Sequence, residues 1–357
     1  MAHQVEPSDA LDPAVDAAFS LRSRLGLLAA LATGLVAVSA AALAMGAYRL
    51  SVADVWATVL ARLGLLGEAV PDGRLHDTVV WNMRLPRIIM AITVGAALSS
   101  SGAVFQGCFR NPLVEPYILG VSSGAAFGAA LGIIYPWFPF SVQVSAFAFA
   151  ALAVAIVYLL ARVRGELAVV TLVLAGVIVG AVFAAGVSML TYLATNVQMR
   201  EIVFWLMGGL YFSTWRDVAI AAPIVTLGVG GMYANGWTLN VLSMGDQEAR
   251  SLGVQPERAR RLLSALATLV TATTVSSVGV IAWVGLMMPH AARLLVGPDN
   301  RFVIPCAVLL GSIYLVLCDT LARTVTASEI PVGIITSILG APYLAYLLRS
   351  RTRGLFG

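Results

Sequence analysis

The stretch LAVVTLVLAGVIVGAVFAAGVSMLTYLATNVQM, residues 167–199, carries no charged side chain over its whole length. A helix that crosses a bilayer needs about 20 consecutive apolar residues, so this stretch is long enough to cross a membrane by itself. It also lacks the regular alternation of polar and apolar residues that a membrane β-strand shows. The stretch therefore predicts a membrane-spanning α-helix.

Seven further charge-free windows extend this pattern along the chain. They cover residues 25–48, 88–109, 116–161, 218–245, 262–289, 302–318 and 330–348. The whole chain is 59% hydrophobic and 11% charged, whereas a soluble domain carries roughly 25% charged residues. We therefore predict an all-α polytopic membrane protein.

Two of these windows are too long for a single span. The window at 116–161 is interrupted by Tyr135-Pro-Trp-Phe-Pro139, an aromatic turn of the kind found at a membrane interface. In the window at 262–289, Gly279 and Pro289 favour a break and a short second span that ends near residue 294. The prediction becomes ten spans in one domain at 25–349, between a disordered tail at 1–24 and a tail at 350–357.

Arginines at the two ends of the chain predict its orientation. Arg22 and Arg24 precede the first window, and Arg349, Arg351 and Arg353 follow the last one. Positively charged residues stay on the cytoplasmic side of a membrane. Both termini are therefore expected in the cytoplasm, which agrees with an even number of spans.

The polar segment, residues 240–261, is a charged island between apolar windows and reads NVLSMGDQEARSLGVQPERARR. Its helix-favouring residues and Gly253 predict a short helix. The orientation above places it in the cytoplasm, where it is either a docking element for a partner or a solvated loop. We expect docking.

All 22 basic residues are Arg, and the chain contains no Lys. A P-loop requires a phosphate-binding lysine, so any ATP hydrolysis needs a separate subunit. Cys108, Cys306 and Cys318 lack metal-ligand spacing and are interpreted as packing residues. The chain itself is therefore not expected to be an enzyme or to bind a metal.

The spans are almost free of ionisable residues. Carriers driven by ion gradients keep such groups inside their spans, which makes a secondary transporter the less favoured alternative. Asp319 and His290 lie toward span ends, where a solvated or hydrogen-bonded role is expected. Gly120, Gly124, Gly128 and Gly132 recur every four residues and predict close helix packing.

Several motifs resemble those of a known family. They are Arg84-Leu-Pro-Arg87, Gln106-Gly-Cys-Phe-Arg-Asn-Pro-Leu-Val-Glu-Pro116, Gly285-Leu-Met-Met-Pro-His290 and Glu329-Ile-Pro-Val-Gly333. The chain is similar in these positions to the permease subunits of iron-chelate, haem and cobalamin ABC importers, which are type II importers. The similarity extends over about residues 80–350.

The resemblance implies an assembly in the bacterial inner membrane. It consists of two permease copies, most simply a homodimer, two cytoplasmic ATPase subunits that bind ATP and Mg, and a periplasmic or lipid-anchored substrate-binding protein. The permease itself would bind no cofactor. Its cargo would be a metal chelate, with a ferric siderophore first and haem or cobalamin next.

The resemblance also implies roles for individual residues. Coupling to the ATPase falls on Gly245, Asp246, Glu248, Ala249, Arg250, Leu252 and Gly253, with the small Ala249 and Gly253 allowing close docking. Docking of the binding protein falls on Arg84, Arg87 and Arg323, for which anchoring at the membrane interface is the alternative.

The resemblance places the inner gate at Asn111 and Leu113, although Asn111 before Pro112 is also an ordinary turn. The fifth and tenth spans would line the path. Their hydroxyl residues are Thr171, Ser188, Thr191, Thr336 and Ser337. A third hypothesis, a membrane scaffold that transports nothing, would need neither a gate nor a docking segment.

Overall fold

The computed structural model describes residues 20–46, 48, 50–62, 64–65, 73–137, 140–163, 166–167, 169–326 and 329–352 of the 357-residue chain. The long helices are α2 (Leu21–Ala44), α5 (Leu85–Phe109), α7 (Val142–Ala161), α8 (Val169–Leu193), α10 (Trp215–Ala234), α13 (Pro256–Val278), α15 (Asn300–Ala322) and α16 (Val332–Thr352). The shorter helices are α3 (Val52–Arg62), α4 (Gly73–Asp77), α6 (Val121–Ile134), α9 (Asn196–Met207), α11 (Gly236–Met244), α12 (Asp246–Ser251) and α14 (Val284–Val296).

Four small elements complete the part of the chain that the structure describes. A π-helix (Thr78–Arg84) continues into α5, and a 3-10 helix (Pro116–Leu119) precedes α6. Strands β1 (Arg162–Val163) and β2 (Glu166–Leu167) form a two-residue antiparallel hairpin between α7 and α8. The prediction of an all-α fold is confirmed.

Helix lengths agree with the predicted number of spans. Seven helices in the described residues are long and apolar enough to cross a membrane, and three shorter apolar helices at 121–134, 284–296 and 332–345 bring the number to ten. The window at 116–161 divides into α6 and α7, and the window at 262–289 divides into α13 and α14. Both divisions were predicted.

The helices at the two ends of the predicted domain lie close to its bounds. Helix α2 begins at Leu21 and α16 ends at Thr352, and the apolar part of α16 covers Val332–Ala345. The domain bounds of 25–349 stay a prediction. The remainder of the predicted tails, residues 1–19 and 353–357, lies outside the described residues.

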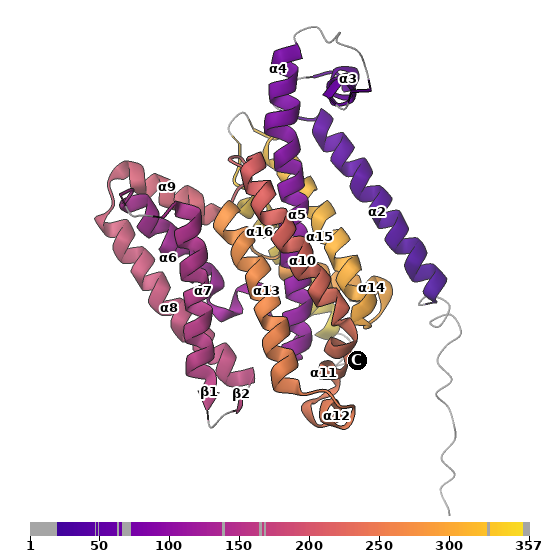
Figure 1. Ribbon diagram of the computed structural model, residues 1–357, viewed down its shortest axis with the longest axis vertical. Helices are drawn as coiled ribbons and strands as arrows, with labels where there is room; N and C mark the ends of the chain where they lie inside the picture. Colours follow the sequence, from indigo (N-terminus) through magenta and orange to yellow (C-terminus); the bar gives the residue numbers. More distant parts are fainter. Residues whose placement is uncertain are drawn as a thin grey trace, which may run out of the picture.

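Helix α5 occupies the centre of the bundle, surrounded by α10, α13, α14 and α15 (Figure 1). Almost every residue of α5 from Pro86 to Phe109 is buried. Ser101 Oγ donates a hydrogen bond to the carbonyl oxygen of Ala267 in α13 at 3.1 Å. Hydroxyl groups that bond across helices replace the hydrophobic drive that lipid cannot provide.

Glycines bring the backbone of α5 into contact with its neighbours. A Cβ atom at Gly102 would overlap the carbonyl oxygen of Gly285 in α14. A Cβ atom at Gly95 would overlap the carbonyl of Gly311 in α15, and the reverse also holds. Small residues at these crossings are therefore required for the packing of the central helix.

Helices α6, α7, α8 and α9 form a group beside this central bundle (Figure 1). Gly124, Gly128 and Gly132 of α6 face α7, where a Cβ atom would press against the backbone of Phe149, Ser145 or Val142. Gly120 differs from the other three because it precedes α6 with a φ of +75°. The four-residue repeat thus includes three packing positions and one turn position.

The break between α13 and α14 is hydrogen-bonded within the protein. Gly279 ends α13 with a φ of +74°, and Trp283 has a φ of 75° before α14 begins. The hydroxyl of Tyr117 donates to the carbonyl of Ile281 at 2.8 Å and accepts from the N–H of the same residue at 3.3 Å. Irregular backbone at membrane depth needs such partners because lipid offers none.

We predict that Gly102→Ala lowers the stability of the protein, because the new methyl group collides with the backbone of Gly285. Overpacking of this kind costs about 1 to 3 kcal/mol. Thermal unfolding in detergent measures the effect. Gly26→Ala in α2, where no atom lies within 4 Å of the added Cβ, is the matched control and keeps the unfolding temperature. Equal unfolding temperatures for the two variants would contradict the packing role.

Candidate functional site

The polar segment folds into the end of α11, the short helix α12 and the first turn of α13. Gly245, with a φ of 141°, separates α11 from α12. Gly253, with a φ of 80°, ends α12: its N–H bonds to the carbonyl of Arg250, and the N–H of Val254 bonds to that of Ala249. This pair of bonds is a Schellman motif. Helix α12 protrudes at the end of the bundle where α2 begins (Figure 1).

The two faces of α12 have different surroundings. Ala249 is completely buried against the rest of the chain, whereas Leu252 is 52% exposed. The small side chain of Ala249 is therefore packed inside the chain, and its role in close docking stays a prediction. Gly253 faces open space, but its positive φ means that a larger residue there also strains the turn.

Four charged residues of the polar segment, Asp246, Arg250, Glu257 and Arg260, form ion pairs within the chain. Arg250 and Glu257 form an ion pair of 2.6 Å at the surface. The carboxylate of Glu248 lies where a Cβ atom of Gly245 would stand. Asp246 Oδ1 accepts a hydrogen bond of 2.9 Å from Arg260 and lies 4.0 Å from Arg110. These contacts give the short α12 a defined orientation.

The start of the polar segment is attached to the start of α15. Asn240 donates from its side-chain amide to Asp299 at 2.7 Å, and its Oδ1 accepts from both nitrogens of Asn300 at 2.8 Å. Burial alone would raise the pKa of Asp299, but the hydrogen bonds from Arg301 and Asn240 outweigh it and lower the pKa to about 2. The carboxylate form of Asp299 is therefore favoured by folding.

The predicted gate corner begins where α5 ends. Arg110 follows α5 with a left-handed φ of 51°. Asn111 Oδ1 then accepts a hydrogen bond of 2.9 Å from the N–H of Leu113, and Leu113 is 53% exposed. Asn111 therefore forms an ordinary turn, and Leu113, the other residue predicted for the gate, is exposed beside it. Its assignment to the gate stays a prediction.

Gln106 holds this corner against α14. Its side-chain amide donates to the carbonyl of Val114 at 3.3 Å and to that of Leu286 at 3.3 Å. Arg293 in α14 donates to Gln106 Oε1 at 2.5 Å. The corner is consequently attached to α14 through one buried side chain.

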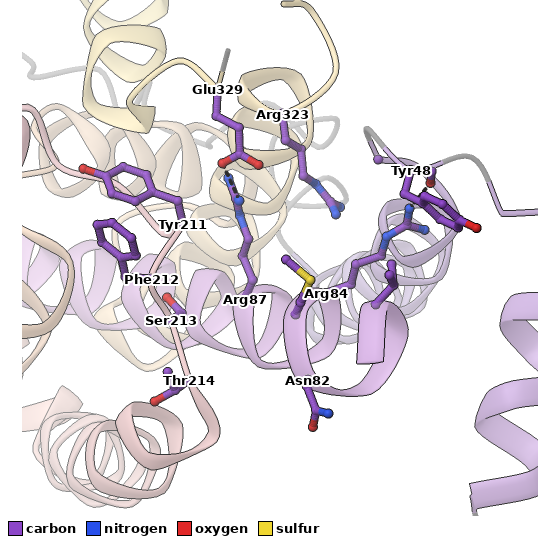
Figure 2. A pocket seen from close by; sticks show the side chains of 13 residues that line it. Tyr48, Asn82, Arg84, Arg87, Tyr211, Phe212, Ser213, Thr214, Arg323 and Glu329 are labelled. Carbon is purple, nitrogen blue, oxygen red and sulfur yellow. Dashed lines mark hydrogen bonds and ion pairs between the residues drawn. The ribbon is translucent and has the colours of Figure 1, made fainter. Parts of the chain in front are cut away.

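The arginines predicted to dock the binding protein line one pocket (Figure 2), and Arg84 and Arg87 lie at the start of α5, at the end of the bundle opposite α12 (Figure 1). Arg84 is buried and donates to the carbonyls of Leu43 and Ala44 at 2.8 and 3.1 Å, at the end of α2. Arg323 is buried as well and donates to the carbonyl of Ala42. Both side chains therefore bind carbonyls that the end of α2 leaves free.

Arg87 takes part in a buried ion network. Its Nε lies 2.8 Å from Asp319 Oδ1, and its Nη1 lies 2.7 Å from Glu329 Oε2. Its Nη2 is buried and has no hydrogen-bond partner among the residues that the structure describes. The pocket beside it has a volume of about 440 Å³ and is also lined by Arg84, Arg323 and Glu329 (Figure 2). The docking role stays a prediction for all three arginines.

Asp319 lies inside helix α15 and is 1% exposed. It was expected to be solvated or hydrogen-bonded near a span end, and the structure shows the second arrangement, with Arg87 as the partner. Its long sequence separation from Arg87 explains why the sequence did not reveal the pair. Charged groups this deep need partners, because unpaired burial is costly.

The five hydroxyl residues proposed for the path differ in their burial. Ser188, Thr191 and Ser337 donate to carbonyls of their own helices. Thr336 does the same and is completely buried in the chain, so its hydroxyl is not available to a cargo in this conformation. Thr171 lies near the start of α8 and is half-buried.

Arg260 is the functional candidate that the sequence did not single out. It is 2% exposed and lies in the first turn of α13. One indication was present in the sequence, because Pro112 has no N–H and leaves a carbonyl of the preceding helix without a partner. Among the described residues, no cluster of three or more His, Cys, Asp or Glu side chains could hold a metal ion.

The sequence of this chain is similar to those of known permeases. The model of the FecCD transport family matches residues 34–350. The cobalamin import system permease protein BtuC of Halobacterium salinarum is 47% identical over 276 residues, 77% of this chain and 74% of that protein. The molybdate import system permease protein MolB of Haemophilus influenzae is 36% identical and covers 90% of this chain and 94% of its own length.

A solved structure supports the same relationship. It is described as an inward-facing conformation of a metal-chelate type ABC transporter. It superposes with a TM-score of 0.80 at 34% identity, and the match covers 91% of this chain and 99% of that one. The similarity therefore includes the central bundle and the helices beside it.

The low pKa of Asp299 predicts a pH-dependent contribution to stability. The folded pKa of about 2 lies below the usual value of 3.8, so the stabilisation is complete above pH 4 and is lost as the pH falls toward 2. Asp299→Asn should therefore be less stable than the wild type by about 2 kcal/mol at pH 6. The difference should shrink in acid. Unfolding of both proteins in detergent between pH 6 and pH 3 measures it, and a constant difference would contradict the linkage.

Proposed function

The chain belongs to the FecCD transport family and is a multi-pass permease subunit of an ABC importer, and from this premise we propose that it carries a metal chelate inward by ATP-driven alternating access. The permease is not itself an enzyme. Hydrolysis takes place in partner ATPases, which bind ATP and Mg. The observation that carries the proposal is the protruding helix α12, whose outer residue Leu252 is exposed while its inner residue Ala249 is buried.

Helix α12 fits the role of a coupling element because it is short and firmly attached. A Schellman motif ends it, the Asp246–Arg260 contact joins it to α13, and the preceding helix α11 is joined to the start of α15 by the Asn240–Asp299 contact. A force applied at Leu252 would consequently displace α12 together with α13, instead of only bending a flexible loop. We assign the end of the bundle that carries α12 to the cytoplasm, together with both termini, and the membrane to the bacterial inner membrane.

A second copy of the permease would complete the path. Large apolar side chains on α8 are exposed in the single chain, among them Val182 at 67% and Tyr192 at 84%. Lipid can cover such a face, but a gated path requires a wall on the other side. We propose that two copies, as a homodimer, enclose the path between their α8 and α16 helices.

The opposite end of the bundle would receive the substrate-binding protein, either periplasmic or lipid-anchored. Among the described residues, Arg87 Nη2 has no hydrogen-bond partner, and Arg87 and Glu329 line the same pocket. An acidic side chain of the docked protein could bond to Arg87 there. Arg84 and Arg323 would act mainly by holding the end of α2 in place.

The cargo cannot be taken from overall identity, because relatives named for cobalamin and for molybdate both align with most of this chain. We propose a ferric siderophore as the first candidate, with haem or cobalamin next. The hydroxyl and apolar side chains of α8 would bind such a cargo weakly, as release requires.

We predict that Leu252→Glu weakens the association with the ATPase subunits by about tenfold or more, since burial of a leucine contributes about 1.5 to 3 kcal/mol. Co-purification and the ATP hydrolysis stimulated by loaded binding protein measure the effect. Leu65→Glu makes the same chemical change at an exposed residue of the opposite end and should leave ATPase association intact. Normal association of the Leu252→Glu variant would refute the assignment of α12.

Uptake by proteoliposomes that contain the permease, its ATPase and its binding protein tests the transport proposal. Labelled ferric siderophore, haem and cobalamin are supplied separately, with and without ATP. We expect ATP-dependent accumulation of one of the three. Accumulation without ATP would favour a secondary transporter, and accumulation of none would overturn the metal-chelate assignment.

A further inference from the structure

Helix α5 ends with a carbonyl that its own backbone cannot satisfy. The N–H groups of Arg110 and Asn111 bond to the carbonyls of Gly107 and Gln106, in a Schellman arrangement. These bonds end the helix, and the next carbonyl, that of Cys108, is one of the last carbonyls that a helix end leaves without a backbone donor. Residue 112, a proline, has no N–H to offer either. The carbonyl of Cys108 therefore requires a donor from elsewhere.

Arg260 supplies that donor from α13. Its Nε donates to the carbonyl of Cys108 at 3.3 Å. The other end of the same guanidinium, Nη2, donates to Asp246 Oδ1 at 2.9 Å. Asp246 is the first residue of α12. One side chain therefore joins the protruding helix, the first turn of α13 and the last turn of α5.

The burial of Arg260 indicates that the connection has a purpose beyond stability. Its side chain is 2% exposed, while that of Asp246 is 35% exposed. Burying a guanidinium is expensive, and well-packed apolar residues of similar volume are often at least as stabilising. A planar guanidinium, however, fixes the distance between two acceptors, which an apolar side chain cannot do.

The gate corner is held from two sides. Arg260 binds it through the carbonyl of Cys108, and Arg110 of the corner faces the same carboxylate of Asp246 at 4.0 Å. On the other side, Gln106 attaches the corner to α14 and to Arg293. A displacement of α12 would thus pull on the corner through Arg260, while Gln106 keeps the corner attached to α14.

We propose that Arg260 is a positioning residue that transmits the movement of α12 to the gate corner at residues 110–114. The inference rests on the proposed function, since it assumes that ATPases move α12. It assigns to a single buried side chain the link between the coupling helix and the inner gate. The link depends on both contacts of the guanidinium being present together.

The test compares Arg260→Met and Arg260→Lys with the wild type in the reconstituted complex. Arg22→Met in α2 is the matched control, because Arg22 is exposed and lies outside the polar segment. Cargo taken up and ATP hydrolysed are measured on the same samples. The ratio of the two should fall about tenfold in both Arg260 variants, with stimulated hydrolysis retained. The control should keep the wild-type ratio.

The Arg260→Lys variant keeps the proposal testable if the Met variant does not assemble. A lysine retains the charge, but its single ammonium group cannot hold both acceptors at a fixed distance. A wild-type ratio in Arg260→Lys, or a parallel fall of uptake and hydrolysis in an assembled variant, would overturn the relay. If the wild-type complex itself shows no ATP-driven uptake, the proposed function fails instead.

A probe at the gate distinguishes transmission from a merely structural role. Cys108, Cys306 and Cys318 are buried, so a cysteine introduced as Leu113→Cys is the accessible target for a charged maleimide. Its labelling rate should change on addition of ATP in an otherwise wild-type complex. The change should be absent when Arg260→Met or Arg260→Lys is combined with it, and its persistence in the combined variants would overturn the proposal.

Discussion

Helix α5 touches its neighbours backbone to backbone at Gly95 and Gly102, and the other helices are arranged around these crossings. Lipid provides no hydrophobic force between helices, so close van der Waals contact has to replace it. Glycine is the residue that permits such contact. The contacts with Gly285 and Gly311 fix α14 and α15 relative to α5, and the elements attached to these helices follow.

The same constraint explains where polar side chains are buried. Each end of α5 faces free helix carbonyls inside the protein, and an arginine bonds to them in each case. At one end, Arg84 and Arg323 bind the carbonyls that end α2. At the other end, Arg260 binds the carbonyl of Cys108, which the end of α5 leaves free. Hydrogen bonds to charged groups contribute about 1.5 to 3 kcal/mol, so these arginines stabilise the helix ends that they contact.

The candidate site was only partly predictable from the sequence, because some of its features are local and others depend on helix packing. The polar segment and the corner at Asn111 are local features, and their helix ends and turn follow from Gly253 and Pro112. The burial of Ala249 was less predictable, because it depends on how α12 packs against α11 and α13. Arg87 and Asp319 are separated by most of the chain, and their pairing replaces the solvated state that their positions near span ends also allowed.

The sequence by itself determined that this chain spans a membrane about ten times, where two long windows divide, and which polar segment lies between spans. These properties depend on the length and polarity of consecutive residues, because each span must by itself be long and apolar enough to cross the bilayer. Only the tertiary structure decided that Arg260 lies between Cys108 and Asp246, and that Ala249 faces inward. The residues around each partner in the sequence do not indicate which other residue it will contact. These contacts form only when the helices pack against each other.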